Sequence, residues 1–291
     1  MLESFLANGL CKGAVFGIVG LGFGMIYTTT RVFHIAHAGV YVLTGYLLHL
    51  GLAHWNWPLA VSIPVALLGA VVAGAFTDWA VYQPLARRSA SGAVVLISSL
   101  GVQIVFENAI ALAFGNQAVA TRTGVDQTVM IGSIVLTYAQ VAQLVAGGGL
   151  SLGLWLFLKY SRAGQVCRAV ADDETLAAVL GVRIARVRLM AFAVGSIFAG
   201  IGSVLISLDV GIDPHDGFPA VLAAAVACIV GGLRKFLAPM AGGLALGLAQ
   251  SVVVWQTSAK WEQAVTFGVL IVFLLVRPQG LFGVRRRAEE A

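Results

Sequence analysis

Residues 93–114 read AVVLISSLGVQIVFENAIALAF, and this stretch decides what kind of protein the chain is. Glu107 is the only charged residue in it. A helix needs about 20 mostly apolar residues to cross the hydrocarbon core of a bilayer. The stretch therefore predicts a transmembrane helix.

The composition of the whole chain agrees with this prediction. Hydrophobic residues make up 59% of the 291 residues and charged residues 11%, whereas about 25% of a soluble domain is charged. So few charges cannot cover a water-soluble surface. The net charge of +5 comes from short basic clusters between apolar runs, which is typical of the loops of a multispanning protein. We predict an all-α integral membrane protein that contacts lipid and does not bind nucleic acid.

Apolar stretches of similar length recur along the chain. They predict about nine transmembrane helices within a single transmembrane domain, residues 1–291, because no linker or second domain interrupts them. Eight helices is the alternative, with the first stretch partly re-entrant. The nine stretches are 9–28, 37–54, 58–82, 93–114, 138–158, 187–208, 217–233, 239–255 and 262–277.

The lysines and arginines predict the orientation, because cytoplasmic loops carry an excess of both. With nine spans and the C-terminus in the cytoplasm, the N-terminus lies outside, and only Lys12, Arg122 and Lys260 fall on the outer side. The other fifteen fall inside: Arg31, Arg87, Arg88, Lys159, Arg162, Arg168, Arg183, Arg186, Arg188, Arg234, Lys235, Arg277, Arg285, Arg286 and Arg287.

Polar residues inside the spans are candidates for a solute pathway, because each is costly in lipid. Gln103 and Glu107 lie four residues apart and so on one helix face, and Asn108 follows them. Glu107 has two interpretations of equal weight: contact with a cationic group of a solute, or a hydrogen-bonded acid that joins helices. Asp78 is expected to pair with Arg87 or Arg88, and Gln250 to form a hydrogen bond between helices.

Other segments carry less chemistry. His34 and His37 lack the further ligands that a metal site needs, so we expect no metal, and no cofactor motif or catalytic constellation occurs. Glycines four apart, such as Gly243 and Gly247, favour close helix packing. Residues 115–137 are expected outside, as an extended segment or a short interfacial helix.

The largest internal loop, about 159–186, predicts one short cytoplasmic helix. Asp172, Asp173 and Glu174 precede a small apolar stretch that Gly181 closes. Acids favour the N-terminus of a helix and glycine its C-terminal end. By composition alone, this helix is equally well explained as a docking element and as a connector.

At this loop the chain resembles a known pattern. ETLAAVLG at 174–181 resembles the loop by which permeases of ABC importers contact a separate ATPase subunit. HIAHAG at 34–39, the glycine-rich block at 218–247 and RPQGLFG at 277–283 resemble segments of the branched-chain amino acid ABC permeases, in the same order. The first of these motifs resembles the H-type subunit of that family. His34, Ala38, Glu107 and Gln250 depart from the usual residues.

The resemblance implies a function and a set of partners. It implies a permease subunit, itself not an enzyme, that forms the pathway for branched-chain amino acids or related amino acids, urea or amides in the cell inner membrane. Glu174, Ala177, Ala178 and Gly181 would form the coupling loop, and His37 matches the motif histidine. The implied partners are a second, M-type permease subunit, two cytoplasmic ATPase subunits and a periplasmic or extracellular solute-binding protein.

Three other classes of protein are weighed against this interpretation. A self-sufficient secondary transporter or channel is the main alternative, but the odd number of spans and the scarcity of intramembrane charges count against it. A membrane enzyme would need a catalytic constellation, and none occurs in the sequence. A purely structural membrane subunit is opposed only by the resemblance.

Overall fold

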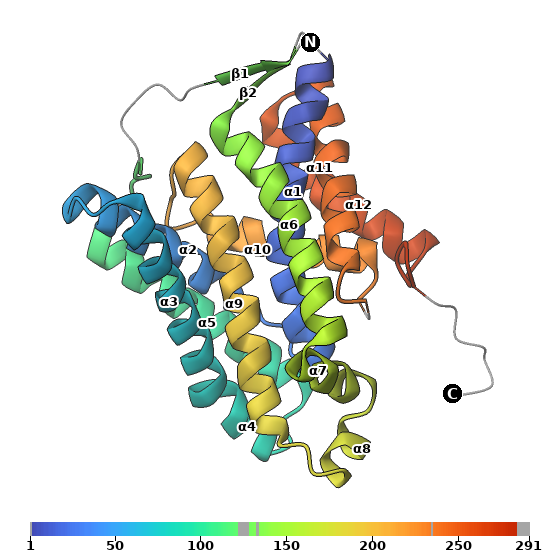
Figure 1. Cartoon of the computed structure of the whole chain (residues 1–291). Helices are drawn as coiled ribbons and strands as arrows, with labels where there is room; N and C mark the ends of the chain where they lie inside the picture. Colours follow the sequence, from blue (N-terminus) through green and yellow to red (C-terminus); the bar gives the residue numbers. More distant parts are fainter. Residues whose placement is uncertain (1, 122–127, 132–133, 234, 284–291) are drawn as a thin grey trace.

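The chain folds, in a computed structural model, into a bundle of long helices (Figure 1). The structure describes all residues except 1, 122–127, 132–133, 234 and 284–291. The α-helices are α1 (Leu2–Thr30), α2 (His37–His49), α3 (Leu59–Thr77), α4 (Gln83–Arg87), α5 (Gly92–Phe114), α6 (Tyr138–Tyr160), α7 (Arg162–Asp172), α8 (Glu174–Val179), α9 (Ile184–Asp209), α10 (Gly217–Gly231), α11 (Ala238–Gln256) and α12 (Glu262–Val276).

Short segments of other helix types extend several of these helices. The π-helical segment η1 (Leu50–His54) continues α2, and η2 (Asp78–Tyr82) joins α3 to α4. A 3₁₀ turn, η3 (Ala259–Trp261), precedes α12. Every one of the nine predicted spans is therefore helical over most of its length.

Helix α1 forms the centre of the bundle, between α11, α9, α10 and α6 (Figure 1). Glycines allow its close contact with α11: a side chain on Gly247 would overlap the backbone of Gly9 and Gly13. In lipid, such contacts gain van der Waals packing that longer side chains would prevent. The predicted packing role of the glycines is confirmed at this contact.

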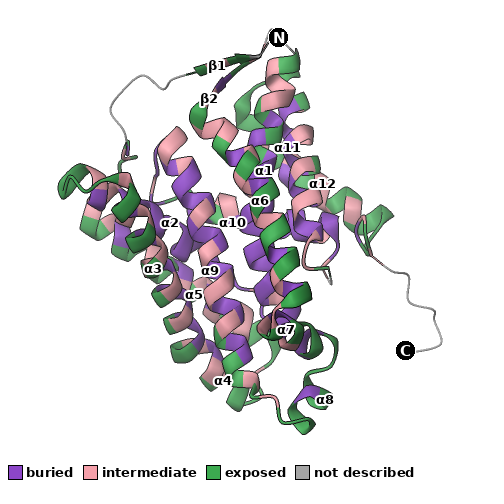
Figure 2. Ribbon diagram, in the orientation of Figure 1, coloured by how far each residue is buried: buried purple, intermediate pink, exposed green. Residues whose placement is uncertain are grey.

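The outer helices α3, α5, α6 and α12 expose apolar side chains (Figure 2). Leu112 of α5 is 88% exposed and Leu275 of α12 is 79% exposed. Patches of this extent on several helices are unusual in soluble monomers and fit a lipid-facing surface. Seven helical segments are long and apolar enough to cross a membrane.

Two predicted spans are not among these seven. They are residues 37–54, formed by α2 with η1, and α10, which has 15 residues. At 1.5 Å per residue, α10 is about 22 Å long, which is less than the roughly 30 Å of a bilayer core. By length and apolar composition, the described residues therefore give seven candidate spans, where the sequence predicts about nine.

Two loop segments have more structure than the sequence predicts. Within residues 115–137, the extended alternative is confirmed for strands β1 (Thr128–Ile131) and β2 (Ile134–Thr137), which pair antiparallel with Thr128 opposite Thr137. These strands are a small addition to an otherwise helical fold. The internal loop contains two helices, because α7 precedes the predicted one. Ser161 caps α7 by accepting a hydrogen bond from the Gly164 N–H at 2.9 Å.

The cations are distributed asymmetrically over the described part of the chain. Lys12 and Lys260 lie near the end that carries the N-terminus. Arg122, Arg234, Arg285, Arg286 and Arg287 lie outside the described residues. The rest lie at the opposite ends of the helices: Arg31, Arg87, Arg88, Lys159, Arg162, Arg168, Arg183, Arg186, Arg188, Lys235 and Arg277. We call this the cation-rich end.

Candidate functional site: a coupling helix, a polar helix face and an inner cavity

Helix α8 lies at the cation-rich end, where the sequence predicts a short helix (Figure 1). Asp173 caps it, since its Oδ1 accepts the Leu176 N–H at 2.9 Å. Beyond it, Gly181 adopts φ = 87°, a left-handed conformation that glycine adopts without steric cost. The predicted capping acid and terminal glycine thus both bound this helix.

The two sides of α8 differ in burial. Ala177 is buried against a cluster that includes Cys167 and Val187, whereas Leu176, Val179 and Leu180 are 56%, 79% and 75% exposed. The predicted residues Glu174 and Ala178 are also exposed. This helix therefore presents an apolar surface away from the bundle while one alanine attaches it to α7 and α9.

Helix α5 carries the predicted polar residues toward the end opposite α8. Glu107 accepts from the Gln103 side-chain amide at 3.4 Å and contacts His215 Nδ1 at 2.5 Å. His215 follows α9, so this pair joins α5 to the loop before α10. Asn108 is exposed and donates to the backbone carbonyl of Ile104 at 2.8 Å. The structure thus brings Gln103 and Glu107 together and leaves Asn108 on the outer surface of the helix.

The charge of His215 depends on this contact. The Glu107 carboxylate raises the pKa of His215 above its ordinary value, and the charges of Asp213 and Asp216 act in the same direction. A raised pKa means that the charged form is favoured in the folded protein. The contact is therefore an ion pair below that pKa and weakens as the pH rises through it.

The His37 side chain forms no hydrogen bond with these α5 residues. It is fully buried, and neither ring nitrogen has a hydrogen-bond partner among the described residues. Two residues further, Gly39 packs against the ring of Phe106 so closely that a side chain would overlap it. The H-A-G motif at 37–39 therefore sets the close approach of α2 and α5.

A hydrogen-bonded chain that the sequence did not predict lies beside His37. Tyr82 Oη is 2.8 Å from His34 Nδ1 and donates to Ser99 Oγ at 2.7 Å. Ser99 Oγ also accepts the Ala36 N–H at 3.0 Å. All of these groups are buried. The sequence analysis singled out His34, but neither Tyr82 nor Ser99, a serine inside an apolar run.

Asp78 does not pair as predicted. Its Oδ1 is 3.3 Å from Arg188 Nη2, and Oδ2 accepts from the Gln83 amide at 2.9 Å. Arg87 is instead the last residue of α4 and Arg88 follows it, and both are exposed. The prediction used nearness in sequence, whereas Asp78 is fully buried and contacts the buried Arg188 of α9.

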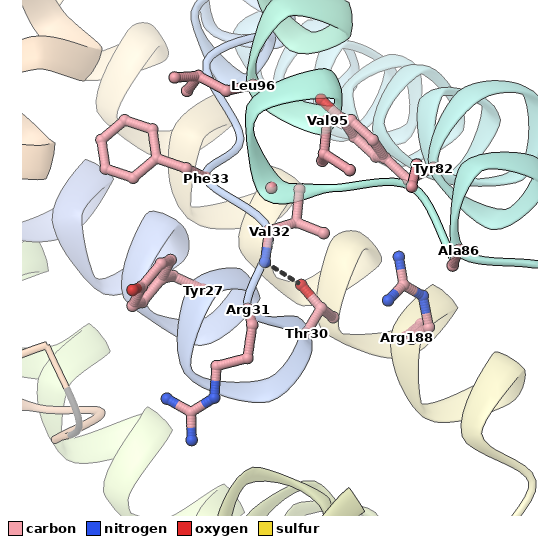
Figure 3. A pocket seen from close by; sticks show the side chains of 12 residues that line it. Tyr27, Thr30, Arg31, Val32, Phe33, Tyr82, Ala86, Val95, Leu96 and Arg188 are labelled. Carbon is pink, nitrogen blue, oxygen red and sulfur yellow. Dashed lines mark hydrogen bonds between the residues drawn. The ribbon is translucent and has the colours of Figure 1, made fainter. Parts of the chain in front are cut away.

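A cavity of about 530 Å³ opens at the cation-rich end of the bundle (Figure 3). We call it the inner cavity. Tyr82 and Arg188 form part of its wall, so both polar contacts described above border it. Figure 3 shows Thr30 between Arg31 and Arg188, and Thr30 Oγ1 accepts the Val32 N–H at 3.3 Å. This volume lies within the range of small-molecule sites. The remaining lining residues are Tyr27, Val32, Phe33, Ala86, Ala90, Gly92, Val95 and Leu96.

One candidate outside the predictions lies in helices α6 and α9. Asp209 accepts hydrogen bonds from Thr137 Oγ1 at 3.1 Å and Gln143 Nε2 at 3.0 Å. In the sequence, Asp209 begins an acidic stretch, DVGIDPHD at 209–216. Gln250, in contrast, donates to Thr266 Oγ1 at 2.7 Å, which confirms its predicted role between helices.

Among solved structures, the chain is similar in fold to the structure described as "PsaBC from Streptococcus pneumoniae in complex with Fab". The TM-score is 0.54 over 96% of this chain and 94% of that one, with 13% sequence identity. At this identity the likeness concerns the fold alone.

Sequence comparisons are closer. The high-affinity branched-chain amino acid transport system permease protein BraD of Pseudomonas aeruginosa is 30% identical, with 96% of this chain and 94% of BraD covered. The permease protein LivH of Escherichia coli is 29% identical, with 95% and 94% covered. The family model described as branched-chain amino acid transport system / permease component matches residues 5–274. The chain therefore belongs to the family of permease components of branched-chain amino acid transport systems.

Proposed function

We propose that the chain is the H-type permease subunit of an ATP-driven importer in the cell inner membrane, and that it moves branched-chain amino acids or related small polar solutes. The observation that carries this proposal is helix α8. It is a short helix with an exposed apolar surface, located at the cation-rich end of an otherwise lipid-facing bundle. ATP hydrolysis would belong to separate partner subunits.

The cation-rich end would face the cytoplasm, because cytoplasmic loops retain lysine and arginine. With α2–η1 and α10 counted as crossings, the single transmembrane domain crosses nine times, with the N-terminus outside and the C-terminus in the cytoplasm. The short α10 can be accommodated because α1, α2, α11 and α12 surround it, and a helix buried in protein need not match the bilayer thickness.

The apolar surface of α8, formed by Leu176, Val179 and Leu180, would dock onto a cytoplasmic ATPase subunit. Only residues 180–183 separate α8 from α9, and Ala177 is packed against the same cluster as Val187 of α9. A displacement of α8 would therefore move the start of α9, including Arg188 at the wall of the inner cavity. This arrangement links nucleotide turnover in the partner to the solute pathway.

The polar face of α5 would line the pathway. Gln103, Glu107 and Asn108 are polar residues on a helix that is otherwise exposed to an apolar environment. Asn108 in particular needs a polar neighbour, because an exposed amide is costly in lipid. A second, M-type permease subunit placed against α5 would supply this neighbour and enclose the pathway, and His37 would support the neighbouring α2.

The solute would enter from an external binding protein and leave through the inner cavity. The two relatives named above are described as branched-chain amino acid permeases, and a cavity of about 530 Å³ has room for such a solute. Specificity would rest largely on the binding protein.

The docking surface can be tested by substitution of one exposed residue. Val179→Asp should abolish ATP-dependent uptake by the reconstituted complex, because a carboxylate would replace apolar contact area. Ala169→Asp is the matched control, since Ala169 is exposed on the adjacent helix α7. Both variants should insert normally in the membrane. Unchanged uptake by Val179→Asp, or equal loss in both variants, would contradict the proposed docking surface. Uptake by the chain alone without ATP would contradict the proposed function.

A further inference from the structure

A second cavity, of about 250 Å³, lies at the end opposite α8, between α1, α6, α9, α11 and α12. It is built from different residues than the α5 face and the inner cavity. Most of its polar lining comes from Lys12, Gln140, Gln143, Asp209, Gln250 and Glu262. We call it the outer cavity.

Among the described residues that line this cavity, Asp209 is the acidic residue that has no ion-pair partner. Both of its carboxylate oxygens accept hydrogen bonds, but the donors are the neutral groups of Thr137 and Gln143. No lysine, arginine or histidine among the described residues forms an ion pair with it. Gln143, which is only 1% exposed, holds the carboxylate in place.

The remaining charges of the cavity neutralise each other. Lys12 Nζ lies 2.7 Å from Glu262 Oε1. The outer cavity therefore carries one net negative charge, located at Asp209. A half-buried carboxylate without an ion-pair partner gains stability when a positive group approaches it.

Gln250 provides an independent sign of a ligand. Gln250 is 4% exposed, and its side-chain amide nitrogen donates to Thr266 Oγ1 at 2.7 Å. Its carbonyl oxygen Oε1 is buried and accepts no hydrogen bond from any described residue. Buried acceptors of this kind are nearly always satisfied in folded proteins. The cavity thus combines an uncompensated carboxylate with an unsatisfied carbonyl oxygen.

We propose that the outer cavity binds the ammonium group of a small primary amine or amino-acid-like solute. An ammonium carries a positive charge for Asp209 and three N–H donors, enough to serve both the carboxylate and Gln250 Oε1. A bare alkali cation would find the same oxygens, and the experiment below distinguishes the two ligands. This site is additional to the pathway proposed along α5, and it does not depend on that pathway.

Cys11 offers a reporter, because it lines the outer cavity while Cys167 and Cys228 do not. With Cys167→Ala and Cys228→Ala in the full chain in membrane vesicles, the rate of Cys11 modification by methyl methanethiosulfonate can be followed by mass spectrometry. Methylammonium chloride should slow the reaction about tenfold at a concentration about ten times its dissociation constant, as mass action requires. Sodium chloride and tetramethylammonium chloride at equal concentration should not protect.

Asp209→Asn should remove the protection by methylammonium, whereas Asp172→Asn, at an exposed acid of α7, should retain it. Should Cys11 not react at all, the midpoint of thermal unfolding replaces the rate: methylammonium should raise it in the unsubstituted chain and not in Asp209→Asn. Equal protection by sodium would overturn the proposal in favour of an alkali-cation site. Equal protection by tetramethylammonium, or none by methylammonium in either assay, would overturn it outright.

Discussion

The buried pair between Asp78 and Arg188 allows a quantitative prediction about stability. Asp78 is fully buried, and Arg188 Nη2 approaches it at 3.3 Å. At an effective dielectric constant of 20, two unit charges at this separation attract by about 5 kcal/mol. Removal of one partner from a buried pair typically costs about 3–5 kcal/mol, because the other charge stays buried. The Gln83 amide remains bonded to Asp78 at 2.9 Å, so we expect Arg188→Met to cost about 3 kcal/mol, at the lower end of that range.

A double-mutant cycle separates this interaction from general damage. Asp78→Asn, Arg188→Met and the double variant would be compared by the midpoint of thermal unfolding in detergent. The double variant should be close to the unsubstituted protein, because neither a buried carboxylate nor a buried guanidinium remains. The coupling energy is then the sum of the two single-variant losses, so it should exceed about 3 kcal/mol. If Arg188→Met destabilises the Asp78→Asn background as much as the original chain, the assigned ion pair does not account for the effect.

Three further outcomes are expected. Gly247→Ala should lower the thermal midpoint strongly, because its side chain would overlap α1, whereas Gly268→Ala, where nothing lies within 4 Å, should leave it unchanged; similar midpoints would refute the packing role. Glu107→Gln should lower the pKa of His215, measured by NMR titration, because the carboxylate that favours imidazolium is removed; an unchanged pKa would show that the pair does not form. Tyr82→Phe removes two buried hydrogen bonds and should destabilise the protein by about 1–3 kcal/mol, again read from the thermal midpoint; no change would mean that the network contributes nothing.

Helix positions could be read from the sequence because the bilayer imposes a simple rule. Each backbone polar group must bond within its own segment, so long apolar runs become helices. The stretch at 93–114 corresponds to α5, and 138–158 to α6, within a few residues. Local signals were equally effective at α8, where Asp173 and Gly181 bound the helix as their chemistry requires.

The loops were less predictable, because their structure depends on contacts with other elements. Helix α7 buries Cys167 and Val170 against the bundle, whereas the sequence analysis predicted one helix in this loop and not two. Residues 115–137 were expected as an extended segment or a short interfacial helix. The sequence did not show that two strands pair within this segment, with Thr128 opposite Thr137.

Polar partners were the least predictable feature. Asp78 was expected to pair with cations nine or ten residues away in the sequence, but it contacts Arg188 on α9. Glu107 was predicted as a polar site on α5, whereas its partner His215 lies in another loop. For Gln250, by contrast, the prediction of a hydrogen bond between helices is confirmed, although it named no partner.

By itself, the sequence indicated that this chain lies in a membrane and, to within a few residues, where its long helices lie, because burial in lipid and local capping act over a few turns of one helix. Its motifs indicated the family. Only the tertiary structure decided which charges meet, where the two cavities lie and which face of α8 remains exposed. These features depend on helix packing, in which residues separated by a hundred positions or more come within hydrogen-bonding distance, and no local pattern encodes that distance.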